Sequence, residues 1–333
     1  MPTAAPVAST PFSLAQLDVA TELVGRFVPP TPQFAWPLLG EAIGAEVWVK
    51  HENHTPTGAF KVRGGIVYAE RHARESGGTP QGLISATRGN HGQSLAYAGR
   101  AFGIGVTIVV PVGNSPDKNA AMRGFGATLI EHGHDFQAAR EYAQQLSIER
   151  DLHMVPSFHP DLVLGVATSS RELFTAAGEL DAVYVPVGMG SGICALMAVR
   201  DLLGLRTEII GVVAEKAPAT ALSFDAGAVV NTERADTFID GIACRSPDAD
   251  AIAAMVAGAA RIVRISEDTG AEAVRLVQRT THNLCEPSGA AALAGLLTEH
   301  DRQQGKRIGV IMTGGNIDVP LLTEILAGRT PAV

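Results

Sequence analysis

The sequence predicts an α/β protein built from two open, twisted parallel sheets with helices on both faces. Short apolar runs alternate with helical segments along most of the 333 residues, which is typical of βαβ units. Hydrophobic residues make up 46% and aromatic residues only 5%, with 36 glycines, which suits helices packed closely on sheets. A chain of this length can form two cores. We expect a small domain at residues 76–160 and a large domain at 1–75 and 161–333.

The spacing of apolar residues predicts the helices and strands along the chain. The lead-in and first segments predict helices at 14–24 and 38–43, a strand at 46–51 and a helix at 62–74. The next stretch predicts strands at 82–86, 106–112 and 128–131, and helices at 92–102, 115–124 and 136–152. The last stretch predicts strands at 181–186, 209–214 and 307–312, and helices at 162–177, 193–203, 266–280 and 289–300.

Charge and cysteine usage exclude several classes of function. The net charge is -8, with 26 basic and 34 acidic residues, and no basic patch suggests nucleic acid as a partner. Cys194, Cys244 and Cys285 lie far apart without a CxxC spacing, which is typical of buried thiols in a reducing compartment. The start of the chain does not resemble a signal peptide, and no apolar run reaches membrane-spanning length. We therefore expect a cytoplasmic protein that does not bind membranes.

Lys61 lies in an unusual local sequence, TPTGAFKVRG, between small residues, Phe60 and a following arginine and glycine. A lysine that attacks a carbonyl to form a Schiff base must be partly desolvated, because desolvation lowers its pKa. A solvated lysine at a helix start is the alternative interpretation, and it is the common one for any single lysine. The rest of the chain must therefore decide between the two.

A glycine-rich turn joins a predicted strand to a predicted helix. Its residues are Gly188, Met189, Gly190, Ser191 and Gly192. Backbone N–H groups in such a turn converge on an anion, and the helix N-terminus adds positive potential. The turn lacks the P-loop lysine and the GxGxxG spacing, so a single phosphate monoester fits it better than a nucleotide. An ordinary tight turn is the alternative.

A second turn follows the predicted strand at 82–86 and carries Thr87, Arg88, Gly89, Asn90 and His91. Its amide and hydroxyl groups suit a carboxylate or a phenolic oxygen, although a simple helix cap would use the same residues.

Two further features concern a ring nitrogen and a cation. Thr313 lies at the carboxyl end of the last strand, where open α/β sheets bind ligands, and its hydroxyl could bond a ring nitrogen. Glu215, with the carbonyl of Ala219, could take part in a small monovalent or divalent cation site, although a solvated glutamate is the alternative. An aldehyde partner for Lys61, a phosphate and a ring nitrogen together describe pyridoxal 5'-phosphate.

Six segments resemble those of the fold-type II pyridoxal-phosphate enzymes, and most closely the serine/threonine dehydratases, or threonine ammonia-lyases. They are KHEN with TGAFKVRG at 50–53 and 57–64, GNHGQ at 89–93, PVGMGSG at 186–192, DGIA at 240–243, EPSGAA at 286–291 and TGGN at 313–316. The set covers most of the chain and implies a fold like that of the tryptophan synthase β-subunit. It also implies a small amino acid as substrate and a homodimer. Because the sequence leaves no room for a C-terminal regulatory domain after TGGN, we expect a catabolic role.

The resemblance also implies roles for individual residues. Lys61 would hold the cofactor aldehyde and then act as the base that removes the α-proton, while Phe60 packs on the pyridine ring. Asn90 would bond the ring hydroxyl, the backbone N–H groups of 188–192 the phosphate, and Thr313 the ring nitrogen. Because a neutral hydroxyl does not keep that nitrogen protonated, the residue type favours rapid β-elimination. We expect Thr87, Arg88, Gly89 and His91 to bind the substrate.

The implied reaction is the loss of water from a 3-hydroxy amino acid of the L-threonine or L-serine type, giving a 2-oxo acid and ammonia. Arg88 departs from the family, because related racemases carry a serine there that acts as an acid or base, which an arginine does poorly. Arg88 therefore argues against racemisation and raises the alternative of a specialised substrate such as 3-hydroxyaspartate; a solvated arginine is equally compatible. A β-replacement synthase and a cofactor-free binding protein remain alternatives. Ala221, where related metal sites carry an acid, puts a divalent site in doubt.

Overall fold

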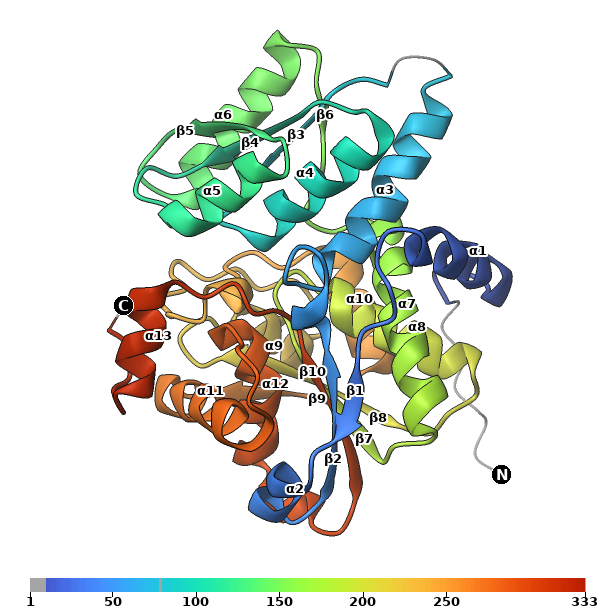
Figure 1. Cartoon of the computed structure of the whole chain (residues 1–333), viewed down its shortest axis with the longest axis vertical. Helices are drawn as coiled ribbons and strands as arrows, with labels where there is room; N and C mark the ends of the chain where they lie inside the picture. The colour runs from blue at the N-terminus through green and yellow to red at the C-terminus, as the bar shows by residue number, and fades with distance from the viewer. Residues whose placement is uncertain (1–9, 78–79, 333) are drawn as a thin grey trace.

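The computed structural model describes residues 10–77 and 80–332, and these fold around two separate sheets. Figure 1 shows the smaller sheet at the top and the larger one below it, with α3 rising along the right of the smaller sheet and α7 at the right of the larger one. The α/β class with two open, largely parallel sheets, predicted from the sequence, is confirmed. The domain bounds predicted above stay a prediction.

The large sheet has six strands in the order β1-β2-β10-β7-β8-β9. Its strands are β1 Gln33–Ala35, β2 Glu46–His51, β7 Ala182–Pro186, β8 Glu208–Ala214, β9 Arg261–Ile265 and β10 Arg307–Met312. All neighbours pair in parallel except β1, which pairs antiparallel with β2 at the edge. This edge strand departs from the purely parallel sheet that we expected, and an antiparallel edge strand on a parallel sheet is common.

The small sheet has four parallel strands in the order β5-β4-β3-β6. Its strands are β3 Leu83–Ala86, β4 Val106–Val110, β5 Thr128–Glu131 and β6 His153–Met154. Every residue of β3 is buried, because helices cover the sheet on both faces. Alternate residues of β3 accordingly enter different cores, with Leu83 packed toward α4 and Ile84 toward α6.

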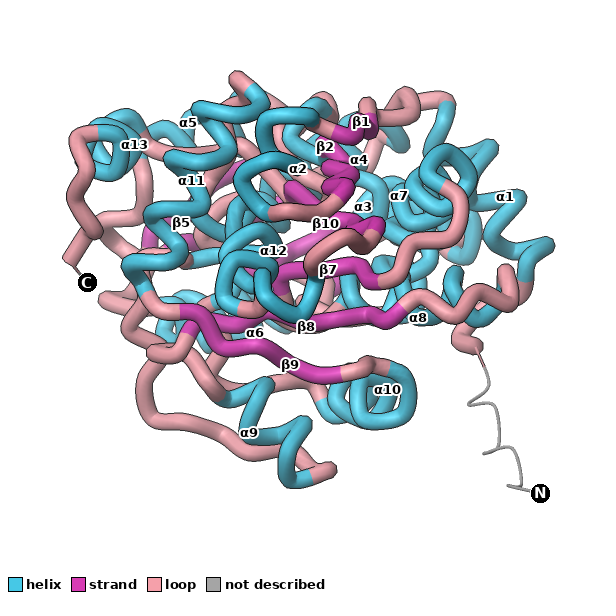
Figure 2. Tube along the Cα trace, turned by 90° about the horizontal axis from the view of Figure 1, so that it is seen from below, coloured by secondary structure: helices cyan, strands magenta, loops and turns pink. Residues whose placement is uncertain are grey.

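Thirteen α-helices cover the two sheets within the described residues. They are α1 Leu14–Gly25, α2 Pro37–Ile43, α3 Lys61–Glu75, α4 Asn90–Phe102, α5 Pro116–Gly124, α6 Phe136–Glu149, α7 Pro160–Ala177, α8 Ser191–Leu202, α9 Ala219–Ala226, α10 Ala249–Gly258, α11 Glu267–Thr281, α12 Pro287–Thr298 and α13 Val319–Leu326. Three short 3₁₀ turns complete the set: η1 Glu52–His54, η2 Asp240–Ile242 and η3 His300–Gln303. Figure 2 shows α11 and α12 on one side of the large sheet and α10 on the other.

The two faces of the large sheet bury different apolar cores. One core joins the sheet to α2, α11 and α12, and the other joins it to α7 and α8 and continues to α3 and α4 beside the small sheet. The second core therefore packs α3, which begins at Lys61, between the two sheets. In the described part of the chain, no helix has the length and apolar character needed to cross a membrane.

Several elements were not predicted, namely β1, β6, β9, α9, α10 and α13. β1 and β6 have only three and two residues, and each exists because it pairs with a longer neighbour. The predicted helix at 136–152 ends at Glu149 instead, and the helix predicted from 289 begins at Pro287, where proline is favoured in the first turn.

Candidate active site

The turn before Lys61 is held by its own hydroxyls and by the end of the large sheet. Thr55 Oγ1 accepts from the backbone N–H of Ala59 at 2.9 Å and donates to its carbonyl at 2.9 Å. Ala59 forms an isolated bridge with Gly314, and Phe60 N donates to Thr313 O at 2.9 Å. The turn is thus fixed against the residues that follow β10, so Lys61 has a defined position at the start of α3.

Lys61 is partly buried, and its ammonium lies 5.2 Å from the centre of the Phe60 ring. Burial lowers the pKa of Lys61 below its usual value, and the nearby Glu286 carboxyl opposes this shift. A lower pKa leaves more of the amine neutral, which is the form that attacks a carbonyl. The setting therefore suits a nucleophilic lysine.

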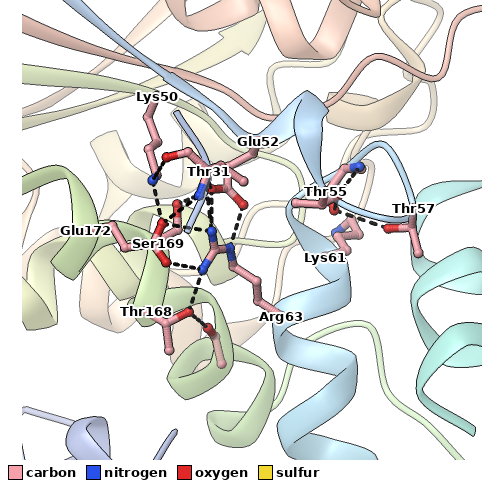
Figure 3. Close-up of polar contacts among 12 residues, drawn as sticks. Thr31, Lys50, Glu52, Thr55, Thr57, Lys61, Arg63, Thr168, Ser169 and Glu172 are labelled. Carbon is pink, nitrogen blue, oxygen red and sulfur yellow. Dashed lines mark hydrogen bonds and ion pairs between the residues drawn. The ribbon is translucent and has the colours of Figure 1, made fainter. Parts of the chain in front are cut away.

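A buried charge cluster anchors α3 two residues after Lys61 (Figure 3). The guanidinium of Arg63 donates to Glu52 at 2.7 and 3.0 Å and to Glu172 at 2.7 and 2.9 Å. It also donates to Thr168 at 3.0 Å, and Lys50 Nζ lies 2.5 Å from Glu172. Arg63, Lys50 and Glu52 are fully buried, and the Glu172 side chain is 15% exposed, so α3 is tied to β2, η1 and α7 by largely buried ion pairs.

The glycine-rich turn leads from β7 into α8. Gly190 has a φ of 103°, in the left-handed region, and it is the N-cap of α8. A Cβ on Gly188 would lie 2.6 Å from the carbonyl oxygen of Gly241, so only glycine fits there. Met189 Sδ contacts Cys244 Sγ at 3.8 Å. The turn is therefore a close-packed backbone cradle at a helix N-terminus, which suits an anion.

One cavity brings the predicted cofactor residues together. It is lined by Phe60, Lys61, Asn90, Gly188, Met189, Gly190, Ser191, Gly192 and Thr313. The same cavity is also lined by Pro186, Gly241, Ile242, Glu286 and Ser288, which the sequence analysis did not assign to a site. The DGIA and EPSGAA segments contain four of these five and were the signal that could have found them.

Hydrogen bonds orient the polar groups of this cavity. Asn90 Nδ2 donates to Glu286 Oε1 at 2.6 Å, and Asn90 Oδ1 accepts from Asn316 at 2.8 Å. The hydroxyl of Thr313 is buried and donates to the carbonyl of Ser288 at 3.2 Å. An unprotonated ring nitrogen can only accept a hydrogen bond, so to bond one this hydroxyl must rotate away from Ser288 and donate to the nitrogen instead.

The predicted substrate residues lie around the cavity and not in its wall. Thr87, Arg88, Gly89 and His91 are absent from its lining, although Asn90, between them in sequence, is present. Arg88 is exposed, and among the described residues its guanidinium has no hydrogen-bond or ion-pair partner. Burial, and then the charge of Lys61, lower the pKa of His91 to about 3, so its imidazole is neutral. Its Nε2 is buried without a partner in the described structure.

The predicted cation residues lie apart from this cavity. Glu215 is exposed, and the carbonyl of Ala219 accepts from Ser223 Oγ at 2.7 Å. In residues 10–77 and 80–332, no group of three or more His, Cys, Asp or Glu side chains could hold a metal ion. The cation stays a prediction.

Comparison with known proteins identifies the family. The family described as "Pyridoxal-phosphate dependent enzyme" matches residues 24–314. This chain belongs to that family. It is therefore a pyridoxal-phosphate-dependent enzyme, and the resemblance noted in the sequence is confirmed.

Several similar proteins are ammonia-lyases or deaminases of hydroxy amino acids by name. The L-threo-3-hydroxyaspartate ammonia-lyase of Saccharomyces cerevisiae is 27% identical over 93% of this chain and 95% of its own length. The L-threonine ammonia-lyase of Thermotoga maritima is 29% identical over 87% of this chain and 72% of its own length. The processed threonine deaminase isoform 2 of Solanum lycopersicum has a TM-score of 0.88 and 28% identity, covering 95% of this chain and 93% of that one.

The residues of the cavity fit the family's cofactor. The glycine turn, where a side chain at Gly188 would strike the backbone, is a cradle suited to a phosphate. A desolvated lysine, an asparagine amide and a threonine hydroxyl supply partners for an aldehyde, a ring oxygen and a ring nitrogen. When bound, pyridoxal phosphate supplies an electron-withdrawing ring that stabilises negative charge at the substrate α-carbon.

Proposed function

We propose that this PLP enzyme is an ammonia-lyase that removes water from a 3-hydroxy amino acid of the L-threonine or L-serine type and releases a 2-oxo acid and ammonia. The observation that carries the proposal is the single cavity that combines Lys61, Asn90, the glycine turn and Thr313. The ammonia-lyases and the deaminase among its relatives support the same reaction class.

Each cofactor residue predicted from the sequence has a proposed part. Lys61 holds the cofactor aldehyde, and its freed amine then takes the α-proton of the substrate. Phe60 packs against the ring, and Asn90 donates to the ring oxygen. The backbone N–H groups of Gly188, Met189, Gly190, Ser191 and Gly192 hold the phosphate. Thr313 faces the ring nitrogen, and because its hydroxyl is neutral it favours quick elimination over a long-lived carbanion.

Incubation of the cofactor-loaded protein with a panel of 3-hydroxy amino acids tests this function. The panel contains L-threonine, L-serine and the stereoisomers of 3-hydroxyaspartate, and 2-oxo acid is followed over time. We expect product from at least one of them without any added nucleophile. A product that forms only when sulfide or a thiol is added would instead indicate a β-replacement synthase. No product under either condition would reject the proposal.

A second candidate substrate is 3-hydroxyaspartate, and Arg88 is the observation that favours it. This arginine is exposed in the turn that carries Asn90, and its side chain has no partner among the described residues, so its charge is available to a ligand. A guanidinium binds a carboxylate with two parallel hydrogen bonds. The L-threo-3-hydroxyaspartate ammonia-lyases of Saccharomyces cerevisiae and of a Pseudomonas species are among the relatives, at 27% and 28% identity.

Replacement of Arg88 by serine tests this assignment. If Arg88 binds the second carboxylate, R88S should lower kcat/KM for 3-hydroxyaspartate relative to L-threonine by about 10- to 100-fold, the cost of a lost charged hydrogen bond. Arg100→Ser, an exposed arginine on α4, is the matched control and should leave the ratio unchanged. An identical substrate profile in R88S and the unaltered protein would remove Arg88 from specificity.

We further propose that the chain is organised as a small domain at 76–160 and a large domain at 1–75 and 161–333, and that it forms a homodimer. The positions of the two sheets support the first proposal, since all strands of the small sheet fall between residues 83 and 154. Light scattering of the purified protein measures the second directly, and a mass equal to one chain would reject it.

A further inference from the structure

A chain of side-chain hydrogen bonds runs along one wall of the cavity. Asn316 Nδ2 donates to the carbonyl of Thr57 at 2.9 Å and to Asn90 Oδ1 at 2.8 Å. Asn90 Nδ2 then donates to Glu286 Oε1 at 2.6 Å. The four residues come from the Lys61 turn, the segment after β10, the start of α4 and the start of α12. The chain therefore joins four of the segments around the cavity.

The direction of this chain is set by the number of donors in each amide. An amide has two N–H groups and one carbonyl oxygen. Asn316 uses N–H groups toward the carbonyl of Thr57 and toward Asn90, so Asn90 must present its oxygen to Asn316. Its NH₂ group then faces Glu286, which takes one of its two N–H groups. The other N–H of Asn90 is left for a ligand in the cavity.

The Glu286 carboxyl group is buried in a site where Gly314 leaves room for it. It is 2% exposed, and a Cβ on Gly314 would lie 2.5 Å from Glu286 Oε1, so the glycine makes the room. The charged groups that face it are Lys61 on α3, Lys118 on α5 and Asp240 on η2, and the last two pair with each other at 2.6 Å. Burial and the charge of Asp240 raise the pKa of Glu286 to about 7, against the opposing charge of Lys118.

We propose that Glu286 is a positioning residue which, together with Asn316, fixes the Asn90 amide so that one N–H points to the ring oxygen of the bound cofactor. The inference rests on the proposed contact of Asn90 with that oxygen. Without Glu286 the amide has one fixed partner instead of two, and its plane can rotate about the Asn316 contact. Because this donor is already fixed, the Asn90 side chain loses less conformational entropy when the cofactor binds.

Two substitutions of Glu286 separate hydrogen bonding from packing. Glu286→Gln keeps an oxygen that accepts from Asn90, whereas Glu286→Leu keeps the volume and removes the acceptor. Apoprotein is titrated with pyridoxal phosphate, and both the dissociation constant and the visible absorbance of the bound cofactor are measured. We expect Glu286→Gln to stay within about 3-fold of the unaltered protein, and Glu286→Leu to bind about 10-fold more weakly with a shifted absorbance maximum.

Glu299, at the opposite end of the same helix, provides a matched control. It bonds Arg261 and Tyr184 away from the cavity, so Glu299→Leu should lower the unfolding midpoint and leave cofactor affinity and absorbance unchanged. Asn316→Ala removes the other partner of Asn90 and should weaken cofactor binding by a similar factor to Glu286→Leu. The double variant should lose less than the product of the two factors, because both act through Asn90.

The outcomes are distinguishable. If Glu286→Leu binds with unchanged affinity and absorbance, or if a folded Glu286→Gln loses as much as Glu286→Leu, the positioning role is overturned. If Glu286→Leu does not fold, Asn316→Ala decides alone, and unchanged binding in that variant overturns the role as well. If the unaltered protein binds no pyridoxal phosphate, the proposed function fails first, and the inference fails with it.

Discussion

Replacing Lys61 by alanine should abolish the visible absorbance of the lysine-bound cofactor and lower 2-oxo acid release by ~10³-fold or more, because the variant loses both the covalent attachment and the base. Both losses should occur together, since one nitrogen serves both purposes. The measurement is the absorbance spectrum of the purified variant with added pyridoxal phosphate, followed by a 2-oxo acid assay with the best substrate. The glycine turn remains, so weak non-covalent cofactor binding should persist.

Lys306→Ala is the matched control, because this lysine is exposed. It should keep the absorbance and the activity of the unaltered protein. A Lys61→Ala variant that is folded, shows the same visible absorbance and retains full activity would contradict the assignment. Activity retained without the absorbance would show instead that catalysis does not need the covalent attachment.

Replacing Arg63 by methionine should lower the free energy of unfolding by about 3–5 kcal/mol, which is the usual cost of leaving a buried charge without its partner. In the unaltered protein two cations, Arg63 and Lys50, face two carboxylates, Glu52 and Glu172. Arg63→Met leaves the fully buried Glu52 and the partly exposed Glu172 with one cation between them. Urea unfolding measures the loss, and cofactor affinity should fall as well, because Lys61 lies two residues away on α3.

Arg74→Met is the control on the same helix. Arg74 pairs with Glu70 at 3.6 Å with 60% of its side chain exposed, so its loss should change stability by less than about 0.5 kcal/mol. If the two variants unfold at the same urea concentration, the buried cluster does not stabilise the fold.

The same cluster makes the stability of the protein depend on pH. Burial opposes ionisation of Glu52, but the charges of Arg63 and Lys50 hold its pKa below the usual value in the folded protein. A carboxyl with a depressed folded pKa stabilises the protein above its unfolded pKa of about 4.3, and that contribution is lost as the pH falls below this value. The free energy of unfolding of Arg63→Met should therefore fall less at low pH than that of the unaltered protein.

The sequence predicted those parts of the fold where burial leaves a clear pattern. The strands at Leu83–Ala86, Val106–Val110 and Ala182–Pro186 are short apolar runs between glycine-containing turns, because helices cover them on both faces. No helix or strand was predicted between 219 and 265, since α10 is apolar at all but one position and β9 does not alternate regularly. Elements such as β1 form through pairing with a distant strand, which a local pattern does not reveal.

The candidate site also has parts that the sequence predicts and parts that it does not. Lys61, Asn90, the glycine turn and Thr313 each follow a strand or begin a helix, so the α/β architecture explains why they meet. The contact between Asn90 and Glu286 joins residues 196 positions apart, and no local feature of either segment encodes it. The same holds for Arg63 and Glu172, which are 109 positions apart. Such pairs depend on how α7 and α12 pack, and that is a property of the whole fold.

Reduction of the cofactor-loaded protein with borohydride, followed by peptide mass mapping, is the most direct test of the central claim that Lys61 carries pyridoxal phosphate. Borohydride makes a lysine-bound cofactor permanent, so the modified peptide identifies the lysine. We expect one modified peptide, the one that contains Lys61, and loss of 2-oxo acid release in proportion to the modification. A cofactor attached to any other lysine, or no attached cofactor in a protein that still releases 2-oxo acid, would contradict the claim.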